Sequence, residues 1–182
     1  KKLIKFISVG RLVKYKGLDV ALRAIKFLVD KRKDINFQYL IIGSGPEEKS
    51  LRSLSYNLGL EKFVKFKGKV NELDKEKFLN ESDIYLFPSI NQSEAYGLSQ
   101  LEAISNGLPV INCNLNNGVN YLLPNNLCAI TVEKQRPDLI YEAIIKIYDD
   151  MNLYFNLSDN GLKRSREFSI ERTRLDYSRV FK

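Results

Sequence analysis

From residue 93 to residue 110 the chain reads Ser93-Glu94-Ala95-Tyr96-Gly97-Leu98-Ser99-Gln100-Leu101-Glu102-Ala103-Ile104-Ser105-Asn106-Gly107-Leu108-Pro109-Val110. A short apolar run at 84–87, closed by Pro88, precedes this stretch. Residues 97–105 are predicted to form a helix that ends at Asn106-Gly107, and 108–111 form the next apolar run. A strand, a loop, a helix and a second strand in this order predict a parallel β-α-β unit.

The same alternation extends outward in both directions. Further strands are predicted at 3–9, 37–42, 63–66 and 127–132. Further helices are predicted at 18–29, 46–58, 71–80, 137–147, 152–166 and 170–181, with Pro46 in the first turn of the second and Ser169 as the N-cap of the last. We therefore expect an α/β fold. It would be a doubly wound, Rossmann-like parallel sheet with helices on both faces, in one domain over residues 1–182.

Composition agrees with a globular domain. The 182 residues are 44% apolar and 28% charged, and no apolar run approaches the ~18 residues that a membrane span needs. Cys113 and Cys128 each lie in or beside a predicted strand, so two buried thiols are expected. Because the chain has no histidine and no third cysteine, neither a disulfide nor a metal site is expected.

The net charge of +7 is compatible with a polyanionic partner or an anionic membrane surface. The basic residues are nevertheless spread along the chain. Their densest clusters, 31–33 and 163–166, lie at predicted helix ends, where cations are favourable. Solvated helix ends are the simpler interpretation, and no nucleic-acid partner is expected.

Ligands of doubly wound sheets bind beyond the carboxyl ends of the strands, which directs attention to five loops. The first, residues 10–17, offers backbone approach at Gly10, a bidentate phosphate grip at Arg11 and a point charge at Lys16. The alternative is two solvated cations. The small loop at 67–70 could present backbone groups to a base, and a structural role alone explains it equally well.

Two other loops carry weaker patterns. Residues 43–46, Gly-Ser-Gly-Pro, are half of a dinucleotide fingerprint and lack its third glycine, so a tight strand-to-helix turn is preferred to an NAD site. The polar fifth loop, residues 114–120, either closes over the site or is a surface turn.

Glu94 and Glu102 flank the predicted start of a helix, a natural place for an anion. The alternatives are a carboxylate favoured by the helix N-terminus for Glu94 and a solvated residue for Glu102. A glycosidase would use two carboxylates, but eight steps of helix span roughly 12 Å, more than the about 5–9.5 Å of such pairs. Two contacts along one long ligand fit this spacing better.

Together these segments resemble the nucleotide-sugar-binding C-terminal domain of family 4 retaining glycosyltransferases (glycosyl transferases group 1), which have the GT-B fold. The matching segments are Val9-Gly10-Arg11-Leu12 with Lys16-Gly17, Ile42-Gly43-Ser44-Gly45-Pro46, Phe66-Lys67-Gly68, residues 83–89, Glu94-Ala95-Tyr96-Gly97 through Glu102-Ala103, Gly107-Leu108-Pro109-Val110 and Phe168-Ser169-Ile170-Glu171.

The resemblance implies a role for each matched residue. Arg11 and Lys16, beside Gly10, would bind the donor diphosphate and stabilise it as it departs, and Glu94 would contact the transferred sugar. Glu102 would hold the ribose hydroxyls. The amides near Tyr96, Gly97 and Leu98 would meet sugar or phosphate, and Lys69 and Val70 would lie by the base. The donor would be a UDP- or GDP-linked sugar, transferred with retention.

No cofactor or metal is expected. The chain has no Asp-x-Asp pair, so Arg11, Lys16 and a helix N-terminus must neutralise the leaving diphosphate. The family often has Gly-Gly in the fifth loop, where this chain has Asn117-Gly118, which puts the contacts of that loop in question.

The resemblance leaves the acceptor-binding N-terminal domain out of this chain, so weak donor binding and little or no transfer are expected of it alone. The full-length enzyme would be cytoplasmic, either free or at the inner face of the membrane, and would act on a glycan or lipid-linked acceptor. Three alternatives stay open: a non-catalytic nucleotide-binding or interaction module, an NAD-type oxidoreductase domain and a basic nucleic-acid-binding domain.

Overall fold

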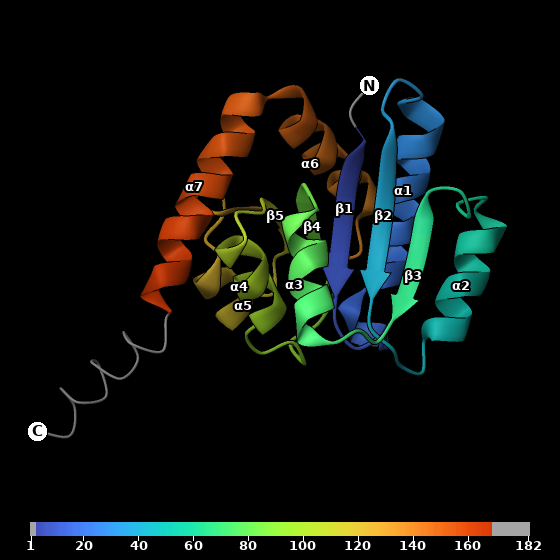
Figure 1. Ribbon diagram of the computed structural model, residues 1–182, viewed down its shortest axis with the longest axis horizontal. Coiled ribbons are helices and arrows are strands. Elements are labelled where there is room, and N and C mark those ends of the chain that lie inside the picture. Colours follow the sequence, from blue (N-terminus) through green and yellow to red (C-terminus); the bar gives the residue numbers. More distant parts are fainter. Residues whose placement is uncertain (1–2, 169–182) are drawn as a thin grey trace, which may run out of the picture.

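The computed structural model describes residues 3–168, in which six strands form one parallel sheet (Figure 1). The spatial order is β3-β2-β1-β4-β5-β6. The strands are β1 (Ile4–Val9), β2 (Phe37–Ile42), β3 (Val64–Gly68), β4 (Ile84–Phe87), β5 (Val110–Cys113) and β6 (Ala129–Val132). The strand order reverses between β1 and β4, and this is where ligands of such sheets bind. The predicted doubly wound sheet is confirmed.

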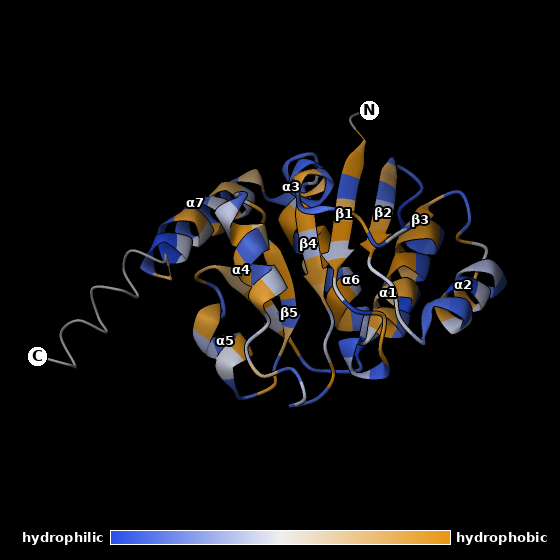
Figure 2. Ribbon diagram, turned by 60° about the horizontal axis from the view of Figure 1, so that its bottom comes forward, coloured by the Kyte–Doolittle hydropathy of each residue, from blue (hydrophilic) through white to orange (hydrophobic). Residues whose placement is uncertain are grey.

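Helices cover both faces of the sheet, as predicted (Figures 1 and 2). Helices α1, α2 and α6 lie on one face, α3 and α4 lie on the other, and α7 packs against α4. The helices are α1 (Leu18–Lys31), α2 (Glu48–Asn57), α3 (Glu72–Asn80), α4 (Leu98–Ser105), α5 (Gly118–Leu122), α6 (Pro137–Asp149) and α7 (Met151–Glu167), with a 3-10 turn η1 (Lys14–Lys16) before α1. None of the helices in residues 3–168 is long and apolar enough to cross a membrane.

The core lies between the sheet and its helices and contains a few buried polar groups near the carboxyl end of β1. The hydroxyls of Ser8 and Tyr39 are 2.8 Å apart, and the Tyr85 hydroxyl donates to the carbonyl oxygen of Val9 at 3.0 Å. Burial raises the pKa of both tyrosines above their usual value. These bonds satisfy the polar groups that burial would otherwise penalise, and they tie β2 and β4 to β1.

The two cysteines are buried and unbridged, as expected. Burial raises the pKa of the Cys113 thiol to about 12, so it stays protonated at neutral pH. Burial also raises the pKa of Cys128. Both behave as small apolar core residues.

The structure differs from the expectations in a few places, among them the start of β6 at Ala129 instead of residue 127. Pro46 lies in the turn before α2, not in its first turn, because the amide of Glu47 donates to the Leu12 carbonyl at 3.0 Å and holds that turn against the first loop. The short helix α5 was not predicted. β5 begins at Val110 and continues to Cys113, two residues beyond the expected end. The predicted helix 170–181, with its N-cap Ser169, lies outside the described residues.

Candidate functional site

The first loop brings Lys16 back over the end of β1. The Lys16 side chain lies over Gly10, where a Cβ atom would be 3.6 Å from Cε of Lys16. Gly17 adopts a left-handed conformation (φ 64°), and a Cβ on it would lie 2.0 Å from the carbonyl oxygen of Pro88. The loop after β1 therefore packs directly on the loop after β4.

Glu94 is the partner of Lys16. The Lys16 ammonium forms a short ion pair with Oε2 of Glu94, and the Ser89 hydroxyl donates to the same oxygen at 3.2 Å. The exposed fractions of the two charged side chains are 16% and 10%. The pair thus joins the two central loops of the sheet in a largely covered position. Ser89 was included only within the matching segment 83–89 and was given no role of its own. Its position directly after Pro88, at the end of a strand, was the one signal that could have indicated its contact with Glu94.

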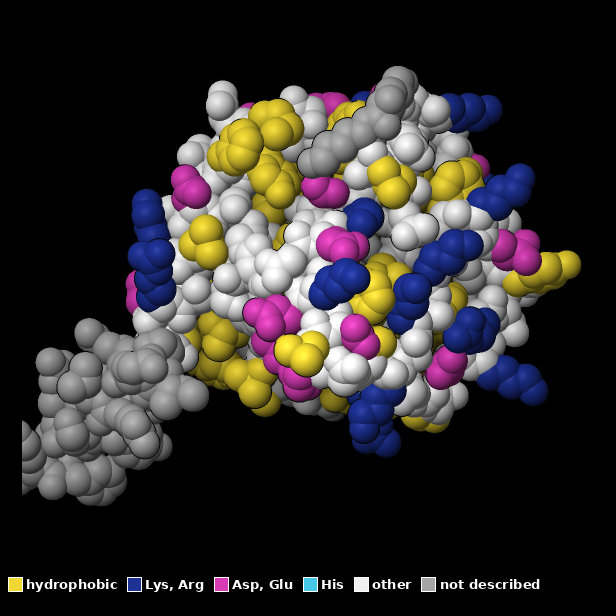
Figure 3. All heavy atoms as spheres, viewed as in Figure 1, with side chains coloured by type: hydrophobic (Ala, Val, Ile, Leu, Met, Phe, Trp, Pro, Cys, Tyr) yellow, Lys and Arg dark blue, Asp and Glu magenta, His cyan; other side chains and the backbone are white. Residues whose placement is uncertain are grey.

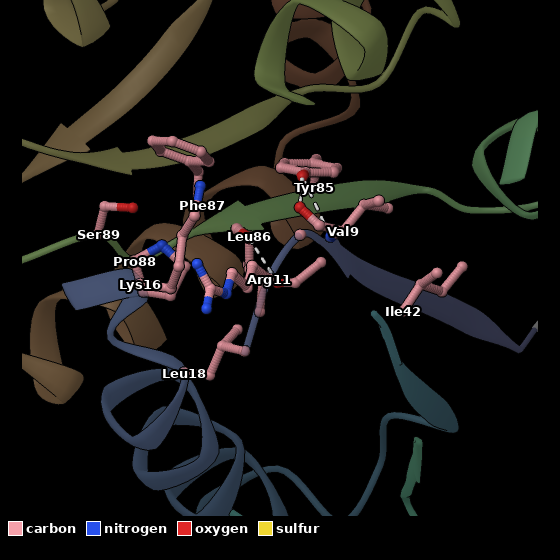
Figure 4. Close-up of a pocket in the computed structure, with 12 residues that line it drawn as sticks. Val9, Arg11, Lys16, Leu18, Ile42, Tyr85, Leu86, Phe87, Pro88 and Ser89 are labelled. Atoms are coloured by element: carbon pink, nitrogen blue, oxygen red, sulfur yellow. Dashed lines mark hydrogen bonds between the residues drawn. The ribbon is translucent and has the colours of Figure 1, made fainter. Parts of the chain in front are cut away.

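Arg11 stands apart from this pair. Its side chain is exposed, and no carboxylate within the described residues forms an ion pair with it. Figure 4 shows Arg11, Lys16 and Ser89 gathered around a small cavity beyond the ends of β1 and β4, with Phe87 lining it as well. A cation without a carboxylate partner at this position is free to bind an anionic ligand.

The N-terminus of α4 opens beside Glu94. Its N-cap, Gly97, is left-handed (φ 70°) and offers no side-chain cap, and a Cβ on it would lie 2.7 Å from Cζ of Phe87. Glycine is therefore required there, and the first amides of α4 keep no side-chain acceptor. Tyr96 is half-buried, with its ring edge-on to Phe168 at 6.3 Å, and the Leu98 side chain is exposed.

The fifth loop packs against the segment that holds Glu94. Asn117 caps α5 by accepting from the amide of Val119 at 3.0 Å, and its side chain donates to the carbonyl oxygen of Glu94 at 2.6 Å. A Cβ on Gly118 would lie 2.5 Å from the carbonyl oxygen of Ala95. The Asn117-Gly118 pair is thus a structural support of the site loop, and neither expectation for the fifth loop described this role.

Buried amides hold α4 in place. Gln100 is fully buried, and its Nε2 donates to the carbonyl oxygen of Val119 at 2.9 Å. Its Oε1 accepts from Asn112 at 3.2 Å, and Asn112 in turn accepts from the hydroxyl of Thr131 at 2.8 Å. This chain of bonds runs from β6 through β5 to α4 and α5, and the sequence reasoning missed it.

Glu102 lies one turn into α4 and has a different partner from Glu94. Its Oε1 accepts from the ammonium of Lys75 on α3 at 3.0 Å. The structure therefore does not join the two glutamates in one acid–base pair. The helical spacing used for residues 94–102 applies only from Leu98 onward, since 94–97 form a loop.

The remaining predicted positions lie along the same edge. Lys69 is exposed and Val70 is half-buried against the core, between β3 and the N-cap of α3 at Asn71. The glycines of residues 43–46 allow close packing: a Cβ on Gly43 would lie 1.8 Å from the Gly10 carbonyl oxygen. This agrees with the tight-turn interpretation.

Charges on the face of the molecule covered by α3 and α4 are mixed (Figure 3). In Figure 3 the Lys and Arg side chains lie among Asp and Glu side chains over this face and form no single basic patch. Within residues 3–168 there is no group of three or more His, Cys, Asp or Glu side chains placed to hold a metal ion.

The model of the glycosyl transferases group 1 family matches residues 1–164. The chain belongs to this family. An uncharacterized glycosyltransferase of Haemophilus influenzae is 31% identical over 166 residues, which cover 91% of this chain and 45% of that protein. This chain therefore spans less than half the length of that relative.

Two solved structures show the same fold. The C-terminal domain of the group 1 protein LpcC from Francisella tularensis matches with a TM-score of 0.76 at 21% identity, over 91% of this chain and 86% of that one. HepE from Anabaena, crystallised with UDP, matches with a TM-score of 0.84 at 18% identity, over 98% of this chain and 49% of that one. The expected GT-B half is confirmed as a fold.

Proposed function

We propose that this chain binds the nucleotide-sugar donor of a glycosyltransferase, with the diphosphate beyond the ends of β1 and β4. The observation that carries the proposal is the arrangement of Arg11 and Lys16 around one cavity at the strand reversal, where Lys16 pairs with Glu94 just ahead of the uncapped α4 N-terminus in the chain. Two cations and a set of free amides are the groups that bind a diphosphate. The UDP in the HepE structure agrees with a nucleotide ligand for the fold.

In this proposal each group has a separate task. Arg11 and Lys16 neutralise the charge that develops on the nucleoside diphosphate as the glycosidic bond breaks. Glu94, held by Lys16 and Ser89, contacts the transferred sugar. Glu102 accepts from the ribose hydroxyls. Lys69 and Val70 border the base, and the amides near Tyr96, Gly97 and Leu98 meet sugar or phosphate.

The whole enzyme needs a second domain for the acceptor. We propose that residues 1–182 are its C-terminal domain, and that an N-terminal acceptor domain completes the cleft. In the same proposal the whole enzyme transfers the sugar with retention, and without a metal, to a glycan or lipid-linked acceptor. It works in the cytoplasm, in peripheral association with the membrane. The chain alone is expected to bind its donor weakly and to transfer little sugar.

Calorimetry with UDP, GDP and their sugars tests the donor site. Arg11→Gln should weaken binding of the favoured diphosphate about tenfold or more, because a charge-assisted bond is worth about 1.5–3 kcal/mol. Arg23→Gln is the matched control, since Arg23 is an exposed arginine on α1, away from the cavity. Absence of binding by any nucleotide would instead favour an interaction module.

A further inference from the structure

Lys75 is a charged residue of α3 that the proposed function leaves without a role. Its ammonium lies 3.0 Å from Oε1 of Glu102 and 2.7 Å from Oε2 of Glu72. It is the residue that connects α3 to Glu102 on α4. Because Asn71, the N-cap of α3, directly follows Lys69 and Val70, this contact also joins the ribose and base positions of the proposed donor site.

We propose that Lys75 is a positioning residue that fixes the carboxylate of Glu102 for the ribose and so gives the site its preference for a ribonucleotide. The inference rests on the proposed function. It extends that function by naming the group that makes Glu102 selective.

The burial of the three side chains shows which contact is firm. The exposed fraction is 18% for Lys75, 42% for Glu102 and 87% for Glu72. The Lys75 side chain is thus mostly covered by the protein. Of its two ion pairs, the one with Glu72 is weakened more by water. Burial lowers the pKa of Lys75, but the hydrogen bonds to Glu72 and Glu102 outweigh it and raise the pKa above its usual value. Lys75 is therefore charged at neutral pH.

The geometry leaves one oxygen of Glu102 available. Lys75 donates to Oε1, and no hydrogen bond from residues 3–168 reaches Oε2. An anchored carboxylate loses less conformational entropy on binding than a free one, so its bond to a hydroxyl is stronger. Lys75 also offsets the repulsion between Glu102 and an anionic donor.

The test compares UDP with 2′-deoxy-UDP, and GDP with 2′-deoxy-GDP, by calorimetry on the full chain. Wild type should prefer the ribonucleotide about tenfold or more, the usual effect of a hydrogen bond to a charged group. Lys75→Met should reduce this preference to about threefold or less, and Lys75→Arg, which keeps the charge, should restore most of it. Glu72→Gln is the matched control and should leave the preference unchanged.

A double-mutant cycle assigns the effect to Glu102. Once Glu102→Ala has removed the carboxylate, adding Lys75→Met should change the preference no further. The positioning role is overturned if the Lys75→Met chain keeps the wild-type preference. It is also overturned if the variant binds the ribonucleotide and the 2′-deoxyribonucleotide more weakly by the same factor. If wild type binds the diphosphates without preferring ribose, this inference fails while the proposed function stands. If wild type binds no nucleotide, the proposed function itself fails.

Discussion

The chain places two lysine–glutamate pairs along one edge of its sheet, and they differ in their surroundings. The inner pair, Lys16–Glu94, is 16% and 10% exposed and receives a further bond from Ser89. The outer pair, Lys75–Glu102, is 18% and 42% exposed. The two lysines are therefore about equally covered, and the pairs differ in their carboxylates, because Glu94 is covered and Glu102 is open to water.

This difference teaches how one edge can combine rigidity with access. A covered ion pair is costly to break, because the remaining charge has no water to replace its partner. An exposed pair contributes little to stability, and its carboxylate can accept from a ligand at the oxygen that its lysine leaves open. The inner pair thus joins the loops that carry the proposed diphosphate site, and in the proposed function the outer pair offers a contact to the ribose.

The largest effect is expected on breaking the inner pair. Glu94→Ala leaves the Lys16 ammonium with little access to water, and we expect the free energy of unfolding to fall by about 3 kcal/mol. Urea denaturation measures it, with Glu102→Ala as the control at about 0.5 kcal/mol. A loss below about 1 kcal/mol for Glu94→Ala would mean that Lys16 reaches water by itself, and the comparison would fail.

A somewhat smaller loss of stability is expected on removing the buried amides that hold α4, the helix that follows the Glu94 loop. Gln100→Leu removes the buried amide that bonds Asn112 and the Val119 carbonyl, and it leaves the side-chain NH2 group of Asn112 without its acceptor. The free energy of unfolding should fall by about 2 kcal/mol. Replacing Gln92, which is exposed in the same loop, by leucine is the control. If thermal melts of the two variants coincide, the buried amides do not support this loop.

Arg11 should affect binding and leave stability alone. Arg11→Gln should weaken the favoured nucleoside diphosphate about tenfold, equal to about 1.4 kcal/mol, while its unfolding changes by less than about 0.5 kcal/mol. Lys16→Gln should instead lower both, because Lys16 also belongs to the inner pair. Isothermal calorimetry paired with urea denaturation separates the two patterns. Equal losses of stability in both variants would remove the distinction between them.

The smallest effect is expected on the stability given by the outer pair. Lys75→Met should lower the free energy of unfolding by about 0.5 kcal/mol at neutral pH. Because the pKa of Lys75 is raised in the folded chain, its contribution is fully present below the unfolded pKa of about 10.4 and is lost as pH rises through the folded value. The difference between variant and wild type should therefore be constant from pH 7 to about pH 9 in denaturation curves. A difference that grows with pH over this range would contradict the assignment.

Particular residues show what the sequence allowed. Alternating apolar runs, with breaks at Pro88 and Gly107, were sufficient for the parallel sheet and most helices, because periodicity reports burial directly. The five-residue helix α5 was missed, since a helix of one turn has almost no periodic pattern. Arg11, Lys16, Glu94 and Glu102 were named as site residues, but Ser89 and Lys75 were not given roles.

The sequence by itself determined that polar loops follow the strands and that Arg11 and Lys16 lie in the loop before α1. Tertiary structure alone decided the partners. Glu94 faces Lys16 because β1 and β4, which are distant in sequence, are neighbours in the sheet, and Glu102 faces Lys75 because α3 and α4 cover the same face. A pattern in sequence specifies which face of an element is buried, whereas the identity of a contact depends on the packing of elements from different parts of the chain.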